Sequence, residues 1–575
     1  MPRSQRVYKK IKFHGNRYSR KEIVTDNKQE HNLSASSSKI DDNLKILDNS
    51  ISKDDLSVSG FRFMDLQLLC DAINISCACS NCKNTNCMRI AEKNRVGVAC
   101  EFEFVCDSCG YKFPFNSSKK CREGIYESNF RLTYGMRCLG KGREGANFLC
   151  GMMNMPPPIA RFDATNKCIA KVICDAAKES MKDAVDNVVK EKNEKEEISE
   201  ESTDLCVSVD GTWMKRGHTS LYGVSSIISV DSGKVLDVAI KSKYCHECTV
   251  RKPLPDPEAE NQWAEKHKNI CCKNYSGSSG GMESAAVVDM FCRSQSQYGV
   301  RYTKYLGDGD SASYKIVLDA NPYECKVDKL ECIGHIQKRV GGRLRRLLKE
   351  KKGVLLTDGK TLGGRGRLSA KEIDSLQVYY GKAIRENNSS TENMKKAIWA
   401  IYFHKLSTDD KPQHQLCPKK GWCKYNNIDK DNYKHKHSLP EAVMDEIKPT
   451  FRVLSDPELL RKCLHGKTQN TNESFNNLVW LRCPKTTFCG VKVLNIAVYD
   501  AVLCFNEGNN GRIKVLRKAG LEPGLHTIMI LNDIDQRRIV KAESNLAKLQ
   551  QEARQNIRAK RKDQEDEDEY AYGGH

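Results

Sequence analysis

The order of the apolar segments between residues 204 and 339 constrains the fold of this chain more than any other feature. Three strand-like runs come first, joined by short turns: DLCVSVDG, LYGVSSIISV and KVLDVAIKSK. A helical stretch, MESAAVVDMFCRSQSQ, then leads to a fourth strand in VRYTKYLGDGD, and a fifth follows in DKLECIGH after a further helix start. Three antiparallel strands followed by alternating helices and strands predict an α/β fold with a ribonuclease-H-like core.

The rest of the 575 residues divides around this core by composition. The first 60 residues are polar with little periodicity, whereas SAKEIDSLQVYYGKAIREN and ENMKKAIWAIYFHKL have the period of helices. We predict seven segments: a disordered basic and polar tail at 1–60, a zinc-ribbon-like and DNA-binding module at 61–158, a helix and charged linker at 159–203, the first part of the core at 204–339, a mainly α insertion at 340–462, the last part of the core at 463–510, and a charged helix with an acidic tail at 511–575.

The charge balance indicates the kind of partner. The chain carries 94 Lys and Arg residues against 74 Asp and Glu, a formal net charge of +20, which favours a polyanion and most simply double-stranded DNA. No apolar run approaches the roughly 20 residues that span a bilayer, and the chain opens with MPRSQRVYKK rather than an apolar signal segment. We expect neither secretion nor a membrane partner, and the basic start RVYKKIKFHGNRYSRK favours nuclear import or a DNA contact.

Twenty-seven cysteines without a signal peptide favour zinc binding in a reducing compartment over a disulfide scaffold. Two CxxC pairs are separated by 23 residues, the pattern of a zinc ribbon with four thiolate ligands: Cys79, Cys82, Cys106 and Cys109. Cys77 and Cys87 are alternatives for one of these ligands. The glycine after the second pair, in CDSCGYKF, is typical of a rubredoxin-type turn.

Two further groups have the spacing of metal ligands. The first is a CxxC pair with a later HxxxC in a loop after the third strand, a CCHC zinc site in which Cys272 competes with the last ligand: Cys245, Cys248, His267 and Cys271. The second lies in the predicted helical insertion and needs His435 or His437 as its fourth ligand: His414, Cys417 and Cys423. Abundant cysteine makes chance clustering a fair alternative for both groups.

Three carboxylates lie at the ends of separate predicted elements. Asp210 ends the first strand, Asp308 ends the fourth, and Glu473 begins a late helix in NTNESFNN that Asn472 is suited to cap. In a ribonuclease-H-like sheet the ends of strands one and four are adjacent and a late helix packs beside them, so the three carboxylates are expected to converge. Such a cluster binds two Mg²⁺ or Mn²⁺ ions, since hard cations prefer oxygen ligands.

Each acidic residue also has an ordinary explanation. Asp before Gly is common turn chemistry, and a Glu near the start of a helix complements the helix dipole. Asp310 is a rival for Asp308, because GDGD offers two carboxylates. If Asp210 binds metal, we expect Gly211 to leave room for a DNA backbone.

A CxxH motif and a basic stretch follow the fifth strand. Cys332 and His335 are predicted to support the carboxylate site, since no matching ligand pair is close in sequence. The basic residues read either as phosphate contacts or as a solvated face, and the nearby acidic site favours phosphate contacts: Lys338, Arg339, Arg343, Arg345, Arg346, Arg365 and Arg367.

Several of these stretches resemble segments of the Mutator-like transposases, in particular their zinc-rich branch found in animals. The resembling pieces cover roughly residues 100 to 510 in matching order: MRCLGKGREGANFLCGMMNMPPP, VSVDGTWMKRGH, YCHEC, HKNICCKNYSGSSGGMES, YLGDGDS, CIGH, GGRGRLS and KTQNTNESFNNLVW. The resemblance implies a ribonuclease-H-like DDE core, interrupted by a helical insertion before the glutamate.

Carried onto this chain, the resemblance assigns the two aspartates to Asp210 and Asp308, the glutamate to Glu473, and the CxxH motif to Cys332 and His335. It implies a DNA transposase that cuts the ends of its element and joins them to target DNA, and an assembly of at least two subunits. The alternative is a domesticated relative that binds and regulates DNA without transposition. All three acidic positions are filled, which favours the enzyme.

Overall fold

The computed structural model describes most of the chain: residues 39–40, 60–196, 203–215, 219–251, 255–308, 312–418, 422–423, 425, 433–435 and 437–546. Residues Lys39–Val540 form one compact unit. The predicted tail at 1–60 lies outside the described residues apart from 39–40 and 60, and so does the predicted acidic tail after residue 546.

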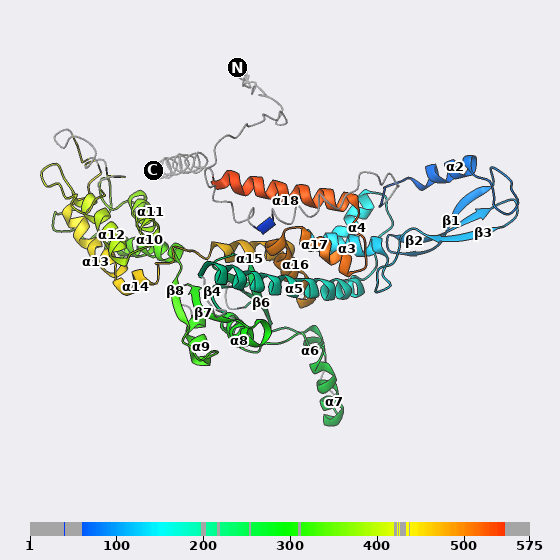
Figure 1. Ribbon diagram of the computed structural model, residues 1–575, viewed down its shortest axis with the longest axis horizontal. Coiled ribbons are helices and arrows are strands. Elements are labelled where there is room, and N and C mark those ends of the chain that lie inside the picture. The colour runs from blue at the N-terminus through cyan, green and yellow to red at the C-terminus, as the bar shows by residue number, and fades with distance from the viewer. Residues whose placement is uncertain are drawn as a thin grey trace, which may run out of the picture. The chain divides into compact units, whose positions relative to one another are not determined.

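A five-stranded mixed sheet with the order β6-β5-β4-β7-β8 forms the centre of the α/β body (Figure 1). Its strands are β4 (Asp204–Trp213), β5 (Tyr222–Ser229), β6 (Val235–Ser242), β7 (Arg301–Gly307) and β8 (Asp328–Glu331). The first three pair antiparallel, and β7 and β8 join parallel to β4 and to each other. The crossovers that parallel pairing requires are α8 (Gly281–Tyr298) and α9 (Ala312–Ala320). The five strand-like runs therefore pair in the order and directions that the sequence predicts.

Alternation along β4 separates the two faces of the sheet. Leu205, Val207 and Val209 point into a core shared with α8. The residues between them are more polar, and Ser208 and Asp210 face the other side, where α15 (Asn470–Arg482) lies. This period of two makes one face of β4 apolar and the other a polar surface for the functional site.

Helices cover the α15 face of the sheet with a second core. The long α5 (Asp163–Glu196) packs against α16 (Val491–Glu507), and both contact β6. The other helices of this layer and its surroundings are α3 (Glu127–Cys138), α4 (Arg143–Met152), α17 (Asn510–Lys518) and α18 (Leu525–Leu546). The helix predicted within the segment 159–203 is α5, which continues to Glu196.

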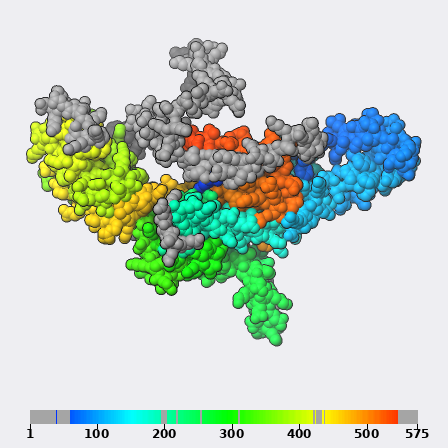
Figure 2. Space-filling model, viewed as in Figure 1, coloured from blue at the N-terminus to red at the C-terminus, as the bar shows by residue number. Residues whose placement is uncertain are grey.

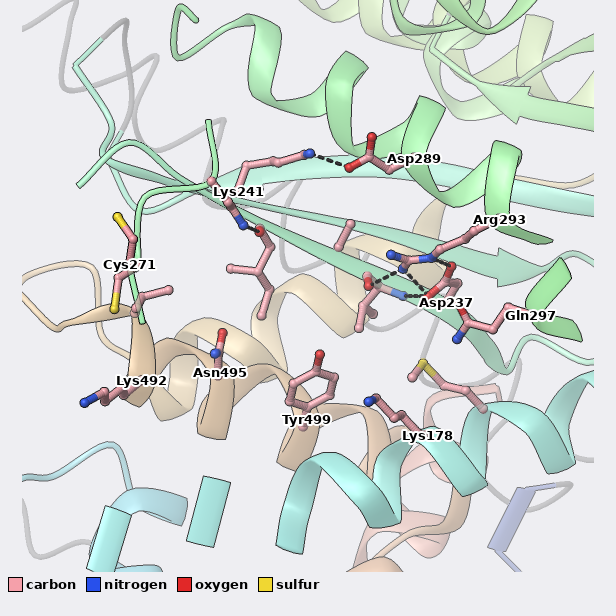
Figure 3. A pocket seen from close by; sticks show the side chains of 17 residues that line it. Lys178, Asp237, Lys241, Cys271, Asp289, Arg293, Gln297, Lys492, Asn495 and Tyr499 are labelled. Carbon is pink, nitrogen blue, oxygen red and sulfur yellow. Dashed lines mark hydrogen bonds and ion pairs between the residues drawn. The ribbon is translucent and has the colours of Figure 1, made fainter. Parts of the chain in front are cut away.

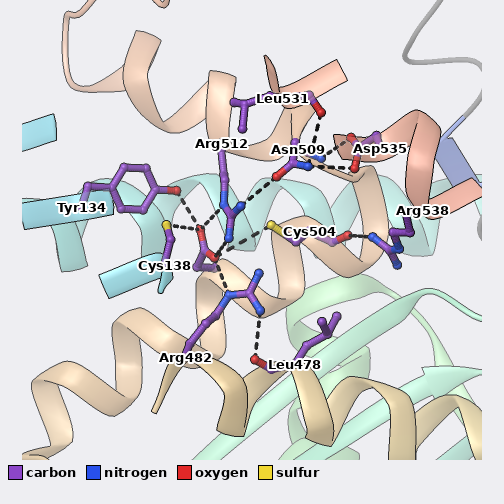
Figure 4. Close-up of polar contacts among 11 residues, drawn as sticks. Tyr134, Cys138, Leu478, Arg482, Cys504, Asn509, Arg512, Leu531, Asp535 and Arg538 are labelled. Carbon is purple, nitrogen blue, oxygen red and sulfur yellow. Dashed lines mark hydrogen bonds and ion pairs between the residues drawn. The ribbon is translucent and has the colours of Figure 1, made fainter. Parts of the chain in front are cut away.

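A buried carboxylate, Asp500 of α16, joins four of these helices (Figure 4). Arg482 Nε lies 2.5 Å and Arg512 Nη2 2.9 Å from the same oxygen, Oδ2, and the hydroxyl of Tyr134 donates to Oδ1 at 2.7 Å. Burial alone would raise the pKa of Asp500, but the two guanidinium groups outweigh it and hold the pKa well below its usual range. The ion pair ties α15 and α17 to α16 and therefore fixes the helix that carries Glu473.

The predicted insertion is helical and has its own hydrophobic core, which includes Ile336, Leu376, Ile398 and Ile447. Its helices are α10 (Ile333–Glu350), α11 (Ala370–Glu386), α12 (Thr391–Leu406), α13 (Glu441–Leu454) and α14 (Pro457–Arg461). Figure 2 shows their side chains as one closely packed group, yellow-green to gold. The predicted boundary at residue 340 falls within α10, so this helix continues from the sheet into the insertion.

The N-terminal module has a separate antiparallel sheet, β1-β2-β3, after a short helix. Its elements are α2 (Leu66–Ser76), β1 (Met88–Val96), β2 (Ala99–Cys106) and β3 (Lys112–Asn116). Two more helices, α6 (His246–Val250) and α7 (Pro257–Lys268), form the loop that follows β6.

A groove of about 710 Å³ follows the outer edge of β6, between α8 and α16 (Figure 3). Four of its charged groups are paired with each other, Arg293 with Asp237 and Lys241 with Asp289. A side chain also forms hydrogen bonds with backbone groups of this edge: the amide of Asn274 donates to Ile240 O and accepts from Ser242 N–H. These contacts protect the edge from pairing with another strand, and the groove lacks the carboxylates of the predicted catalytic set.

Candidate functional site

A polar stripe on α15 faces the polar side of β4. Gln469, Asn472 and Asn476 are spaced at i, i+3 and i+7, which places them on one face of the helix. Gln469 Nε2 donates to Val209 O at 2.6 Å, and Asn472 Oδ1 accepts from the Ser208 hydroxyl at 2.6 Å. The stripe therefore fixes the position of the helix that carries Glu473.

The prediction that Asn472 caps this helix is wrong. Asn472 is fully buried inside the first turn, and its amide donates to Ser226 Oγ at 3.2 Å in β5. Gln469 occupies the N-cap position and makes no side-chain cap. The Asn472 side chain binds the polar face of the sheet and not the helix end, because both its amide oxygen and its amide nitrogen form hydrogen bonds there.

Asp210 does not end its strand, as the sequence suggested, but lies inside β4 and pairs with Ser226 of β5. The strand continues to Trp213, whereas the parallel pairing with β7 stops at Ser208. Asp210 therefore lies just past the point where β7 leaves the sheet, and Asn476 Nδ2 donates to its Oδ2 at 2.8 Å. An ordinary turn does not explain this aspartate.

The predicted carboxylates interact electrostatically. Burial raises the pKa of Asp210 to about 6, and Glu473 contributes to the rise. Glu473 lies in the first turn of α15 and is exposed, while Asp308 directly follows β7 and is also exposed. Asp310, the rival for Asp308, lies outside the described residues.

A fourth carboxylate, missed in the sequence, lies among them. Glu283 is in the first turn of α8, and burial raises its pKa to about 7 with contributions from Asp210 and Asp308. In the sequence, Glu283 is only an acidic residue near the start of a helix, in GGMES. Acidic residues are common at that position because they complement the helix dipole, so this one gives no sign of a function.

Glu283 also corrects the interpretation of Gly211. A Cβ atom at Gly211 would lie 2.6 Å from Glu283 Cγ and from Glu283 Oε2. The space that glycine leaves is therefore filled by Glu283, not left open for a DNA backbone.

The CxxH motif contacts the same site. Cys332 immediately precedes α10, and its sulfur accepts from Gln469 N at 3.3 Å, which links α10 to α15. Burial would raise the pKa of Cys332, but hydrogen bonds with His335 and Gln469 lower it. The pKa of His335 is raised by Cys332 and also by Asp308. The motif thus lies beside the predicted acidic site. Among the described residues, neither the motif nor the carboxylates form one of the close groups of potential metal ligands.

The predicted basic residues fall into two classes. Four are exposed on α10 and one is exposed in the following loop: Lys338, Arg343, Arg345, Arg346 and Arg365. Arg339 is half-buried and pairs with Glu331 at 3.3 Å. Arg367 is buried in an ion pair with Asp358, so its charge is neutralised inside the insertion and it does not form part of an exposed DNA-contacting surface.

Two of the predicted zinc groups form as expected. A tetrahedron with metal–ligand distances of about 2.0–2.3 Å has edges of about 3.3–3.8 Å. Sulfur separations in the first group are 3.7 Å for Cys79–Cys109 and 3.6 Å for Cys82–Cys106. Cys87 adjoins this group without being one of its four members, and Cys77 is exposed.

The second group is similarly compact, with one separation, 3.0 Å between Cys248 Sγ and His267 Nε2, shorter than a tetrahedral edge. Its members are those predicted: Cys245, Cys248, His267 and Cys271. Cys248 Sγ lies 3.6 Å from Cys271 Sγ, and His267 Nε2 lies 3.5 Å from Cys245 Sγ. Trp263 stacks on the His267 ring at 4.4 Å between centroids, which holds the ring in place. Cys272 is not a member.

The third group differs from the prediction in its fourth member, which is His404 of α12 instead of His435 or His437. The four side chains are His404, His414, Cys417 and Cys423. His414 Nδ1 lies 3.2 Å from His404 Nδ1 and 3.5 Å from each sulfur. The last turn of α12 supplies the fourth member. His404 lies ten residues before His414 and is not part of a CxxC or HxxC motif, so local spacing does not reveal it.

His435 instead contacts the outer side of this group. Its Nε2 lies 2.9 Å from His414 Nε2, and its Nδ1 lies 2.7 Å from Asp409 Oδ1. With Nδ1 of His414 facing the group, one tautomer satisfies both contacts: His414 donates to His435, and His435 donates to Asp409. Such outer hydrogen bonds orient a ligating imidazole.

Comparison with protein-family models matches residues 60–423 to the Mutator-like transposases. The matched region includes the N-terminal module, the sheet with Asp210 and Asp308, and all three cysteine groups; it ends before Glu473. A search of curated proteins found no match. Since the family match spans more than half of the chain and holds two of the three predicted carboxylates, the chain belongs to the Mutator-like transposase family.

Proposed function

We propose that this protein is a DDE-type DNA transposase, built on a ribonuclease-H-like core, that cuts the ends of its element and joins them to target DNA. One observation supports the proposal: in a chain of the transposase family, Asp210 interacts electrostatically with Glu473, and Glu283 interacts with both Asp210 and Asp308. The sheet order and directions support the fold assignment.

The residues around Asp210 fit a divalent cation. The Asn476 amide contacts Asp210, and its buried Oδ1 has no hydrogen-bond partner among the described residues. Carboxylate and amide oxygens are the ligands that Mg²⁺ and Mn²⁺ prefer. When bound by Asp210, Asp308 and Glu473, two such ions would activate water and stabilise the charge that develops on phosphate oxygens.

The chain's own contribution is to position these groups. Asn476 holds the Asp210 carboxylate by its Oδ2 atom, while Gln469 fixes α15 against β4. His335 places a positive charge near Asp308 when it is protonated. Because these partners are set before substrate binds, little reorganisation is needed at the reacting phosphate.

The exposed cations of α10 and the following loop form the proposed DNA surface: Lys338, Arg343, Arg345, Arg346 and Arg365. The same helix begins at Ile333 and carries His335 beside the acidic site, so phosphates bound along it would lead towards the carboxylates. Pairing two element ends requires an assembly of at least two subunits. A DNA substrate implies that the protein acts in the nucleus. No helix in the described part of the chain is long and apolar enough to cross a membrane.

All three cysteine-containing groups are proposed to bind Zn²⁺ and to stabilise their local folds. Elemental analysis of the purified chain is expected to give three zinc equivalents, one for each group. His404→Ala should lower this to two, because the third group then has three ligands. His437→Ala serves as the matched control and should leave the count unchanged; the reverse pattern would show that His404 is not the ligand.

Removing the hydrogen bond between His435 and His414 should weaken zinc binding to the third group less than removing one of its ligands. His435→Ala is expected to weaken zinc binding about 10- to 100-fold without removing a ligand, since His414 loses the partner that orients it. Competition with a chromophoric chelator measures the affinity. Wild-type affinity in this variant would rule out an orienting role for His435.

The function is tested with the full chain and DNA carrying the terminal sequences that flank its coding region. We expect strand cuts at the element's termini and joining to a second DNA in Mg²⁺, and neither product in EDTA. DNA binding without cutting would favour the regulatory, domesticated alternative. Cutting that persists in EDTA would contradict the proposed metal mechanism.

A further inference from the structure

We propose that Glu283 is a fourth carboxylate of the acidic site and binds the divalent metal together with Asp210 and Asp308. This inference rests on the proposed function. It adds a residue from α8, on the other face of the sheet from α15, to a site otherwise described by Asp210, Asp308 and Glu473.

The position of Glu283 is closely defined. Its carboxylate lies against the backbone of Gly211, the residue after Asp210, where a Cβ atom would be only 2.6 Å away. The Ser313 hydroxyl donates to Glu283 Oε1 at 3.4 Å and is itself 3.1 Å from Ser284 Oγ. Both serines are buried, so the carboxylate is held by neutral groups at the base of the site.

Glu283 differs from two buried carboxylates of this fold, Asp237 and Asp500. Asp237 is neutralised by Arg293 from the same helix, α8, and Asp500 by two arginines. Among the described residues, no Lys or Arg forms an ion pair with Glu283, and its charged neighbours are Asp210 and Asp308. A carboxylate buried beside others and without a cation is costly, and a bound metal removes that cost.

The charge balance agrees with two divalent ions. Four carboxylates carry four negative charges, which two Mg²⁺ or Mn²⁺ ions neutralise. Independently of the acidic residues, Asn476 is 8% exposed and its Oδ1 has no partner among the described residues, although its Nδ2 contacts Asp210. An unpaired buried acceptor at this place points to a cation or its bound water.

Mn²⁺ binding to the full chain, with its zinc sites filled, tests the proposal directly. Titration calorimetry of Glu283→Gln is expected to show at least about a 10-fold weaker affinity or the loss of one equivalent. Gly211→Ala should have a similar effect, because the added methyl would collide with the Glu283 side chain. Asp289→Asn, an exposed acid-to-amide change on the same helix, should bind as wild type.

A measurement without metal separates this role from a structural one. In EDTA, Glu283→Gln should raise the melting temperature by a few degrees, since it removes repulsion from Asp210, while Asp289→Asn should not. A lower melting temperature for Glu283→Gln would mean that Glu283 stabilises the fold, and the proposal would be wrong.

The outcomes distinguish this inference from the proposed function. If Asp210→Asn weakens Mn²⁺ binding but Glu283→Gln and Gly211→Ala do not, only the role of Glu283 is overturned. If Asp210→Asn also binds Mn²⁺ as wild type does, the acidic metal site itself is overturned. Weaker binding in all three variants supports both.

Discussion

Replacing Asp210 by Asn is expected to lower the rate of DNA-end cutting in Mg²⁺ by about 1000-fold or more. The amide has the size of the carboxylate and retains an oxygen that accepts from Asn476 Nδ2. The amide lacks the negative charge that favours binding of a hard cation, so we expect the rate of the chemical step to fall. Cutting of a labelled terminal fragment under single-turnover conditions measures it, and anisotropy should show unchanged DNA affinity.

The matched control is Asp204→Asn on the same strand. Asp204 pairs with Arg301 near the start of β4, six residues before Asp210, and we expect the variant to cut at close to the wild-type rate. Equal rates for wild type, Asp204→Asn and Asp210→Asn would remove Asp210 from the mechanism. If Asp210→Asn also unfolded at a lower temperature in EDTA, the loss of activity would have to be assigned to the fold.

Replacing Asp500 by Ala is expected to lower the free energy of unfolding by about 3–5 kcal/mol. The change leaves Arg482 and Arg512 in a buried place without their common partner, and the Tyr134 hydroxyl loses its acceptor. The cost comes from these uncompensated charges more than from the lost attraction. Urea unfolding followed by tryptophan fluorescence measures the shift in midpoint.

Asp533→Asn on α18 is the control, because its ion pair with Arg537 is exposed and such pairs contribute little. The sign of the pH dependence gives a second check. The pKa of Asp500 is lowered by folding, so its contribution is present above the unfolded pKa near 4 and is lost as the pH falls further. An Asp500→Ala variant as stable as Asp533→Asn would contradict the role of the network.

The proposed acidic site has four carboxylates, and sequence reasoning identified three of them: Asp210, Asp308 and Glu473. The fourth is Glu283. Asp210 and Asp308 follow apolar runs that are recognisable as strands, and Glu473 begins a recognisable helix. Glu283 also begins a helix, yet nothing near it in the sequence separates it from an acidic residue that only complements a helix end. Its importance depends on contact with Gly211, 72 positions away, which only the folded sheet creates.

The strand order, the helical insertion and two cysteine groups were determined by the sequence itself. Periodicity reports which face of an element is buried, and a CxxC knuckle holds two ligands within a few residues, so both are local properties. Tertiary structure alone decided that His404 completes the third group, that Asn472 binds the sheet, that Arg367 is neutralised, and that Glu283 lies against Gly211. The contacts of Asn472 and Glu283 join elements far apart in the sequence, whereas His404 and Arg367 meet partners nine or ten residues away. In all four cases packing decides which side chains come into contact, and sequence spacing does not report it.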